Sequence, residues 1–260
     1  MPTASFRFYG PLNDFLPAVR RQATLVCDVA SGASVKDLVE ALGVPHTEIN
    51  HLVVNGRMVD FTRTVRAGDR VAAYPAFRTL EVAGAVYLGP PPQAEPRFVA
   101  DVHVGRLAAY LRLAGFDVAY RNDYSDTEIV AISAAEDRTV LTRDVGVLKH
   151  RDVMRGYFVR DTRPGWQLVE VLRRFDLRAR AAPFTRCVRC NVLLRSVPKD
   201  DVIESLPLRT REHYEKFSRC VSCGRVYWAG SHYIRMRLLL DAAFSAADGE
   251  PHAGDRHTPP

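Results

Sequence analysis

The chain has 260 residues, of which 47% are hydrophobic and 25% are charged, and its formal net charge is +6. This is the composition of an ordinary soluble protein, and no apolar run approaches the ~18 residues that a membrane span requires. The N-terminus also has no signal-peptide core. We therefore expect a protein without membrane contact, built as two domains or as one domain with an appendage.

The first 78 residues predict a small α+β domain. Ser34 caps a helix over 35–42, which has apolar residues at helical spacing and ends at Gly43. Asn55-Gly56 is a strong signal for a two-residue hairpin turn. The expected strands are 5–9, 22–28, 52–54, 57–59 and 70–74.

This order of elements resembles the ubiquitin-like β-grasp fold, most closely that of the small sulfur carriers. Those carriers end in a Gly-Gly tail that is activated at its carboxylate. Here the chain continues through Pro75-Ala76-Phe77 without such a tail. The resemblance therefore favours a docking or RNA-positioning module, with the ribosome or a protein as its expected partner, over sulfur transfer.

Residues 79–96 are expected to form a linker, because Gly89 to Pro96 is rich in proline. Residues 97–182 then alternate strands with helices, which implies a mainly parallel sheet covered by helices. The expected strands are 97–100, 117–120, 139–142 and 157–159, and the expected helices are 104–114, 126–136, 145–150 and 165–176.

Four acids lie where the strands of this domain give way to helices. Asp101 and Asp144 follow two strands, and Asp126 and Glu128 lie in the first turn of a helix. Ligands of parallel sheets bind beyond the carboxyl ends of the strands, and clustered carboxylates are stable mainly around a divalent cation such as Mg²⁺ or Mn²⁺. Alternatively, Asp101 and Asp144 are helix N-caps, and Glu128 completes a capping box with Ser125.

Four of the five cysteines form two Cys-x-x-Cys pairs separated by 29 residues, Cys187 with Cys190 and Cys220 with Cys223. Two such turns can complete the tetrahedron of thiolates that Zn²⁺ prefers. Four thiolates leave no position open for substrate, so we expect this zinc to be structural. Two disulfides or four unrelated thiols are the alternative. Thiols that hold zinc must stay reduced, which favours the cytoplasm.

Positive charge is concentrated around these cysteines. Residues 181–240 contain 11 Lys or Arg against 5 Asp or Glu, whereas residues 1–92 contain 9 against 8. Such a surplus suits a surface that contacts phosphate, although it equally suits a solubilising face. The candidate phosphate contacts are Arg106, Arg112, Arg143, Lys149 and Arg151, and the candidate base-stacking side chains are Tyr227, Trp228 and His232.

Residues 97–236 resemble the PIN-like nuclease known as the Mut-seven C-terminal RNase domain. The matching stretches are Phe98 to Asp101, Gly105 to Asp117, Asp126-Thr127-Glu128, Leu141 to Asp144, Cys187 to Asn191, Cys220 to Gly224 and Tyr227 to His232. The resemblance implies a PIN-like domain over 97–182 followed by a zinc ribbon. Tyr233 to Phe244 is expected to form a helix, so that ribbon and C-terminal helix together occupy 183–246. The composition of residues 247–260 predicts a disordered tail. The resemblance also implies that Asp101, Asp126, Glu128 and Asp144 bind the catalytic metal, with the choice between 126 and 128 open.

The leading hypothesis is a ribonuclease that depends on Mg²⁺ or Mn²⁺ and holds RNA through a zinc ribbon. The first alternative is a non-catalytic RNA-binding or ribosome-associated adaptor, in which the acids cap helices. The second is a sulfur-relay protein, which the absent Gly-Gly tail disfavours.

Overall fold

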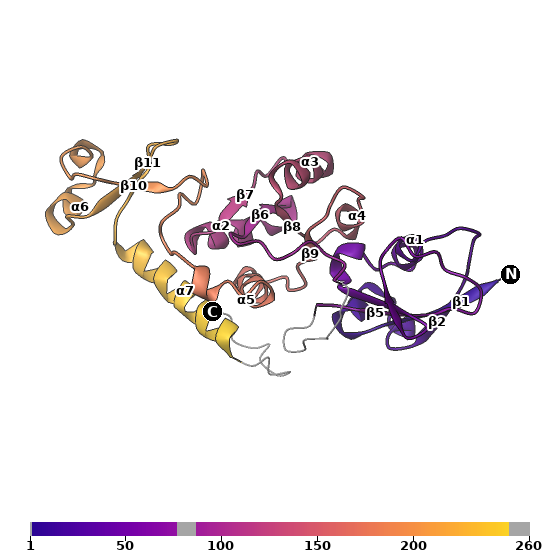
Figure 1. Ribbon diagram of the computed structural model, residues 1–260. Helices are drawn as coiled ribbons and strands as arrows, with labels where there is room; N and C mark the ends of the chain where they lie inside the picture. Colours follow the sequence, from indigo (N-terminus) through magenta and orange to yellow (C-terminus); the bar gives the residue numbers. More distant parts are fainter. Residues whose placement is uncertain (1, 77–86, 250–260) are drawn as a thin grey trace. The chain divides into compact units, whose positions relative to one another are not determined.

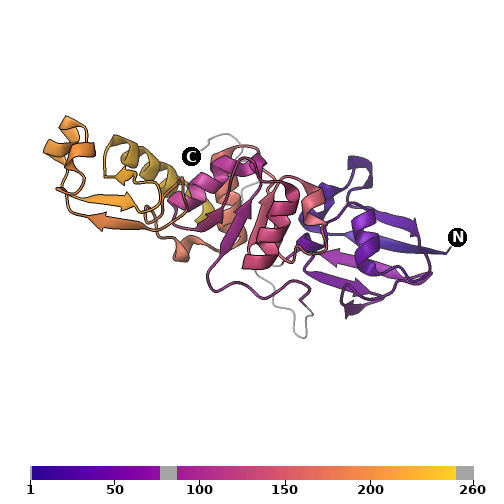
Figure 2. The ribbon, with the colours of Figure 1, turned by 90° about the horizontal axis from the view of Figure 1, so that it is seen from above.

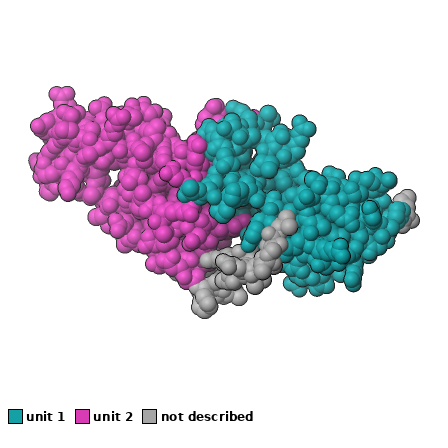
Figure 3. Space-filling model, in the orientation of Figure 1, with its two compact units in different colours: residues 1–94, 126–158 teal, residues 95–125, 159–260 magenta. Residues whose placement is uncertain are grey.

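The computed structural model describes residues 2–76 and 87–249. Residues 79–86 of the expected linker and residues 250–260 of the expected tail lie outside the described residues. The chain forms two compact units (Figure 3): unit 1 consists of residues 1–94 and 126–158, and unit 2 of residues 95–125 and 159–260. Each unit therefore combines two separate stretches of the sequence.

Unit 1 begins with a five-stranded sheet of order β2-β1-β5-β3-β4. The strands are β1 (Thr3–Phe8), β2 (Thr24–Asp28), β3 (His51–Val54), β4 (Arg57–Val59) and β5 (Arg70–Tyr74). β1 runs parallel to β5, and the other neighbours are antiparallel. Alternate residues of β1 face the core, since side chains of a strand point to opposite faces of the sheet.

Local sequence signals explain the turns of this sheet and its helix α1 (Val35–Ala41). The Ser34 hydroxyl accepts a hydrogen bond from the Asp37 amide, and the Asp37 carboxylate accepts one from the Ser34 amide, which completes a capping box. Asn55 (φ 51°) and Gly56 (φ 82°) adopt the left-handed backbone that a type I′ hairpin turn requires. The predicted strands and helix are confirmed here.

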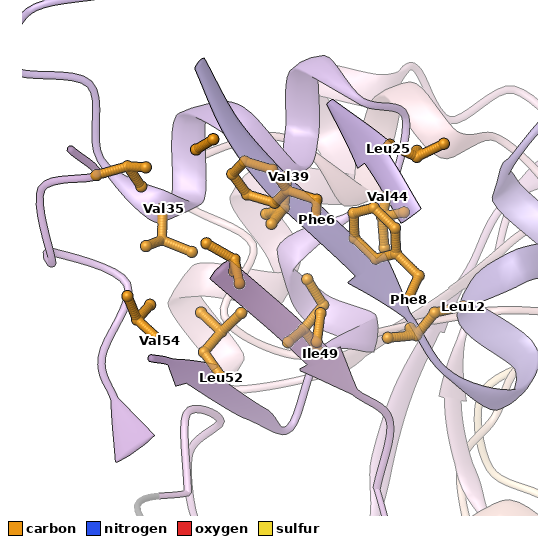
Figure 4. Close-up of a cluster of buried hydrophobic side chains, with 14 of the residues drawn as sticks. Phe6, Phe8, Leu12, Leu25, Val35, Val39, Val44, Ile49, Leu52 and Val54 are labelled. Carbon is orange, nitrogen blue, oxygen red and sulfur yellow. The ribbon is translucent and has the colours of Figure 1, made fainter. Parts of the chain in front are cut away.

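Figure 4 shows the core that joins α1 to the sheet. Phe6 and Phe8 of β1 belong to one buried cluster with Val35 and Val39 of α1 and Leu52 of β3. Burial of these apolar side chains supplies the main stabilisation of the domain, at about 1.5–3 kcal/mol for each large side chain.

The second stretch of unit 1 contains α3 (Asp126–Glu136), β8 (Thr139–Thr142), α4 (Val145–Leu148) and β9 (Gly156–Phe158). β8 pairs with β9 in parallel, with Leu141 opposite Tyr157. The short helix η3 (His46–Glu48) of the N-terminal sheet packs on β9. This stretch is therefore integrated with the N-terminal domain.

Unit 2 contains a second parallel pair, β6 (Arg97–Ala100) with β7 (Asp117–Ala119). The helix α2 (Gly105–Leu113) connects the two strands. Further along, α5 (Pro164–Arg174) packs along α7 (Ser231–Asp248), as both ribbon views show (Figures 1 and 2). The two parallel pairs confirm the expected parallel sheet structure after the N-terminal domain.

The cysteine-bearing part of unit 2 is a three-stranded antiparallel sheet of order β10-β11-β12. Its strands are β10 (Leu194–Val197), β11 (Phe217–Cys220) and β12 (Val226–Tyr227), and the sequence did not predict its helix α6 (Leu208–His213). The remaining 3-10 helices are η1 (Gly10–Phe15), η2 (Ala18–Arg20), η4 (Val102–Val104), η5 (Arg178–Arg180) and η6 (Ile203–Ser205).

Candidate metal centre and acidic residues

The four cysteines of the two Cys-x-x-Cys pairs converge, and their sulfur atoms all lie within 4.8 Å of one another. The sulfurs of Cys187 and Cys223 are 3.8 Å apart. A tetrahedral site with Zn–S bonds of about 2.3 Å places its sulfurs roughly 3.8 Å apart. All five cysteines are free thiols, so the disulfide alternative is wrong and the cluster fits a metal ion.

Both pairs form the same kind of turn. The amide of Cys190 donates to the sulfur of Cys187 (3.3 Å), and the amide of Cys223 donates to the sulfur of Cys220 (3.4 Å). The next residues, Asn191 (φ 68°) and Gly224 (φ 71°), have left-handed backbones. Asn and Gly tolerate this conformation better than other residues, which is why these turns could be predicted from the sequence.

Cys187 is prepared for metal binding by its surroundings. Its sulfur lies 3.2 Å from the Tyr227 hydroxyl. Burial alone raises the pKa of the Cys187 thiol, but the hydrogen bonds from Tyr227 and from the Cys190 amide outweigh it and lower the pKa to about 6. Because only the thiolate binds a metal, this environment favours a bound cation.

The buried side chain of Arg112 anchors the first cysteine turn to α2. The Arg112 guanidinium donates to the carbonyls of Val188 and Arg189 within the turn, each at 3.0 Å. It also donates to the carbonyls of Val118 and Tyr120 at 2.9 and 3.3 Å. Burial lowers the pKa of Arg112. Arg112 is thus a structural side chain, and the expectation that it contacts phosphate is corrected.

Asp101 is the candidate acid of unit 2. It follows β6 and is buried, with 2% of its surface exposed. One carboxylate oxygen accepts from the His103 amide (3.4 Å), which caps η4, and the other lies 2.8 Å from Nδ1 of the His103 ring. The capping interpretation of Asp101 is confirmed, and His103 is an orienting partner that sequence reasoning missed.

The other three candidate acids belong to unit 1. Asp126 and Glu128 are exposed in the first turn of α3. Asp144 follows β8 and caps α4, because its Oδ1 accepts from the Gly146 amide at 2.6 Å. The hydroxyl of buried Thr142 accepts from the Asp144 amide at 2.8 Å and fixes this turn. Thr142 is a second residue that sequence reasoning missed, since a strand threonine carries no distinctive signal.

Within the described ranges, the four cysteines are the single group of three or more His, Cys, Asp or Glu side chains close enough to share one ion. Asp126, Glu128 and Asp144 do not form such a group within unit 1. The acids therefore stand at strand ends and helix starts, and their joint action on a metal stays a prediction.

The candidate phosphate contacts have different surroundings. Arg106 and Arg151 are exposed, and Arg151 lies 3.6 Å from the Asp152 carboxylate. The Arg143 guanidinium lies over the Phe158 ring, 6.0 Å from its centroid. Lys149 donates to the Glu40 carbonyl at 2.7 Å. Arg106 and Arg151 are the side chains of this set that are open to a ligand.

The aromatic candidates lie at the end of β12 and shortly after it. Trp228 is half-buried and packs against a small core of Val202, Leu206 and Phe217. His232 is exposed at the start of α7. Both line a cleft in unit 2 together with Tyr227.

These features define the class of the protein: a mixed α/β chain with an N-terminal β-grasp domain, parallel strands after it and a four-cysteine centre suited to a metal. Residues 96–240 match the family model described as the Mut7-C RNAse domain, and residues 1–81 match the model described as Mut7-C ubiquitin. The chain belongs to the Mut7-C RNAse domain family, with a ubiquitin-like domain in front.

Solved structures of small archaeal modifier protein 1 from Haloferax volcanii also show similarity. One is 23% identical with a TM-score of 0.25, and it covers 30% of this chain and 100% of its own. A second is 23% identical with a TM-score of 0.24, and the match covers 29% of this chain and 96% of that structure's chain. Among curated proteins, none matches this chain. No helix within the described residues is long and apolar enough to cross a membrane.

Proposed function

We propose that this protein is a ribonuclease that cleaves RNA phosphodiester bonds with the help of a Mg²⁺ or Mn²⁺ ion. The match of residues 96–240 to an RNase domain family carries the proposal. The acids after β6 and β8 and at the start of α3 support it, because they lie where the chain passes from parallel strands into helices, and α/β folds bind ligands beyond the carboxyl ends of such strands.

The catalytic residues of the proposal are Asp101, Asp126, Glu128 and Asp144. Their carboxylates are hard oxygen donors of the kind that Mg²⁺ and Mn²⁺ prefer. A bound ion of this kind supplies charge stabilisation to a phosphodiester under attack and lowers the pKa of water. His103 and Thr142 hold Asp101 and the Asp144 turn in fixed orientations, so these two acids are preorganised.

The cysteine centre has a different role in this proposal. Four thiolates saturate a tetrahedral zinc ion and leave it no position for substrate. Arg112 and Asn191 tie the first cysteine turn to α2 and β7. We assign this centre to structural zinc in a zinc ribbon, which holds the basic segment 181–240 in shape for RNA binding.

The second candidate function is a non-catalytic RNA-binding adaptor. One observation favours it, since Asp101 and Asp144 both cap helices, which is sufficient reason for an aspartate at these positions. A capping aspartate still has lone pairs for a cation, so the two functions are separated by experiment.

The decisive variant is Asp144→Asn, because asparagine caps a helix as well as aspartate does but removes the negative charge. We expect the variant to fold normally and to lose at least about 100-fold in cleavage of a single-stranded RNA with Mn²⁺, since even outer partners of metal ligands are worth 10–100-fold. Cleavage is measured by gel and folding by circular dichroism.

Asp123→Asn is the matched control, because Asp123 is exposed and pairs with Arg121 at 2.8 Å. It should retain activity. Full activity of Asp144→Asn would refute the proposed role of Asp144, whereas a wild type that binds RNA but does not cleave it with Mn²⁺ would leave the adaptor as the better proposal. Metal dependence is tested by removing divalent ions with a chelator and restoring Zn²⁺ alone or Zn²⁺ with Mn²⁺; cleavage should return only with Mn²⁺.

A further inference from the structure

Unit 2 contains a cleft of about 520 Å³ beside the cysteine centre. Tyr110 of α2 lines it, and so do Tyr227, Trp228 and Tyr233, which lie at the end of β12 and at the start of α7. Its volume lies within the ~300–1,000 Å³ that small-ligand sites usually occupy.

The aromatic rings of this cleft are held in place by contacts with neighbouring side chains. The Tyr227 hydroxyl is fixed to the Cys187 sulfur, and the Tyr233 ring packs on the Phe184 ring at a centroid distance of 4.1 Å. Trp228 is backed by the small core of the sheet. Gly230 leaves space for its indole, because a Cβ atom at Gly230 would lie 2.8 Å from Trp228 Nε1. A planar ligand would therefore meet rings that are already ordered, which reduces the entropy lost on binding.

The charged groups that line the cleft have one sign. Arg186 and Arg225 line it together with the imidazole of His232, and no acidic side chain does so among the described residues. Arg186 is held by the carbonyls of Gly115 and Asn191, whereas Arg225 and His232 are exposed. Ordered aromatic faces beside cations suit a ligand that joins a flat aromatic group to an anion, which is the chemistry of a nucleotide.

We propose that this cleft binds an unpaired base of single-stranded RNA, with Arg225 and His232 contacting the adjoining phosphates. The inference deepens the proposed function, since it assigns the place where the zinc-bearing segment grips the strand. A duplex does not fit this site, because its bases are stacked and paired and cannot be inserted between the rings.

Trp228 is a direct reporter of the cleft. The chain has two tryptophans, so Trp166→Phe leaves Trp228 as the single tryptophan. Asp144→Asn is added to prevent cleavage during the measurement. In this full-length background we expect a single-stranded RNA decamer to quench Trp228 fluorescence. The duplex of the same sequence, and a decamer that lacks its bases, should not quench it.

Tyr233→Leu keeps apolar bulk but removes a stacking face, and we expect it to weaken binding of the decamer about 10-fold by fluorescence anisotropy. Arg225→Ala should weaken it about 3-fold and reduce the salt dependence. Arg195→Ala is the matched control, since Arg195 is exposed on β10 outside the cleft, and it should change the affinity less than 2-fold.

Anisotropy that reports binding without any change in Trp228 fluorescence would overturn the proposal, and so would equal effects of Tyr233→Leu and Arg195→Ala. Quenching by an apolar peptide but not by RNA would assign the cleft to a protein partner instead. The cleavage assay distinguishes this proposal from the proposed function. Cleavage by the wild type without quenching of Trp228 would refute the RNA site in the cleft alone. Quenching of Trp228 without cleavage by the wild type would refute the ribonuclease proposal alone.

Discussion

Arg112 shows how a single buried charged side chain can hold a cysteine turn in place. It has 5% of its surface exposed and donates to four backbone carbonyls, two of them inside the first cysteine turn. Peptide carbonyls buried without a donor would each destabilise the fold by about 1–3 kcal/mol. The planar fork of an arginine can serve several carbonyls at once, which a lysine ammonium cannot.

We therefore expect Arg112→Lys to lower the free energy of unfolding by about 2–3 kcal/mol, because at least one buried carbonyl loses its donor. The measurement is urea denaturation of the zinc-loaded protein, followed by circular dichroism. Arg106→Lys is the control on the same helix; Arg106 is exposed, so the change should stay within about 0.5 kcal/mol. Equal stability of the two variants would mean that Arg112 does not support the turn.

At the scale of elements, the two cysteine turns are alike in backbone but different in attachment. In both, the residue after the second cysteine has a positive φ and donates to the carbonyl of the first cysteine at 2.9 Å. The Asn191 side chain also accepts from the Val118 amide (3.0 Å) and donates to the Asp117 carboxylate (2.7 Å). A Cβ at Gly224 would meet only the Arg219 guanidinium, at 3.7 Å.

This difference predicts unequal tolerance to substitution. Asn191→Gly keeps the left-handed backbone but loses both side-chain contacts, and Asn191→Ala adds backbone strain, so alanine should be worse than glycine by about 1 kcal/mol. Both should release zinc faster than the wild type in a colorimetric chelator assay. Gly224→Asn should release zinc at the wild-type rate, since asparagine accepts this backbone and the space is open. Rapid release from Gly224→Asn, or wild-type release from Asn191→Ala, would contradict this account.

Local signals in the sequence were sufficient for most elements and for the cysteine turns. The Asn55-Gly56 hairpin, the Ser34 cap and the alternation of strands and helices each depend on residues close together in the chain. Tertiary contacts decided the rest. The helix α7 was expected over 233–244 but reaches Asp248, where the distant Arg173 donates to the carbonyls of Ala246 and Ala247. The buried role of Arg112 depends in the same way on contacts more than 70 residues away.

The acids were found from their positions at strand ends, but sequence could not show what each carboxylate contacts. The Asp144 carboxylate caps α4, and the Asp101 carboxylate pairs with His103. Capping by either aspartate was an open alternative at the level of sequence, because the same residue types serve capping and metal binding, whereas the contact of Asp101 with the His103 ring was not foreseen. The experiment on Asp144 separates the two roles because asparagine satisfies only one of them.

At the scale of the molecule, the N-terminal domain is not an isolated module. It packs in unit 1 with residues 126–158, through hydrogen bonds between residues more than 100 positions apart. Glu48 accepts from the Phe158 amide (2.6 Å), Lys149 donates to the Glu40 carbonyl (2.7 Å), and the His46 ring contacts the Val153 carbonyl (3.1 Å). The stretch that carries Asp144 is therefore supported by the ubiquitin-like domain.

This arrangement predicts that damage to the N-terminal core spreads to the candidate catalytic segment. Leu52 is fully buried in that core, and Leu52→Ala should lower the free energy of unfolding of unit 1 by about 2–5 kcal/mol. Because residues 140–158 pack on the same domain, their amides should exchange with deuterium faster in the variant. Hydrogen exchange followed by mass spectrometry measures both stretches in one experiment.

Val19→Ala is the matched control. It truncates an apolar side chain of the same domain that is 91% exposed, and it should leave hydrogen exchange unchanged throughout the chain. If Leu52→Ala accelerates exchange only within residues 1–74 and spares 140–158, the ubiquitin-like domain opens independently, and the contacts of Glu48 and Lys149 are too weak to couple them. If exchange accelerates in both stretches together, the ubiquitin-like domain stabilises the segment that carries Asp144. Its loss would then impair cleavage even though no residue of the domain is proposed to bind the metal.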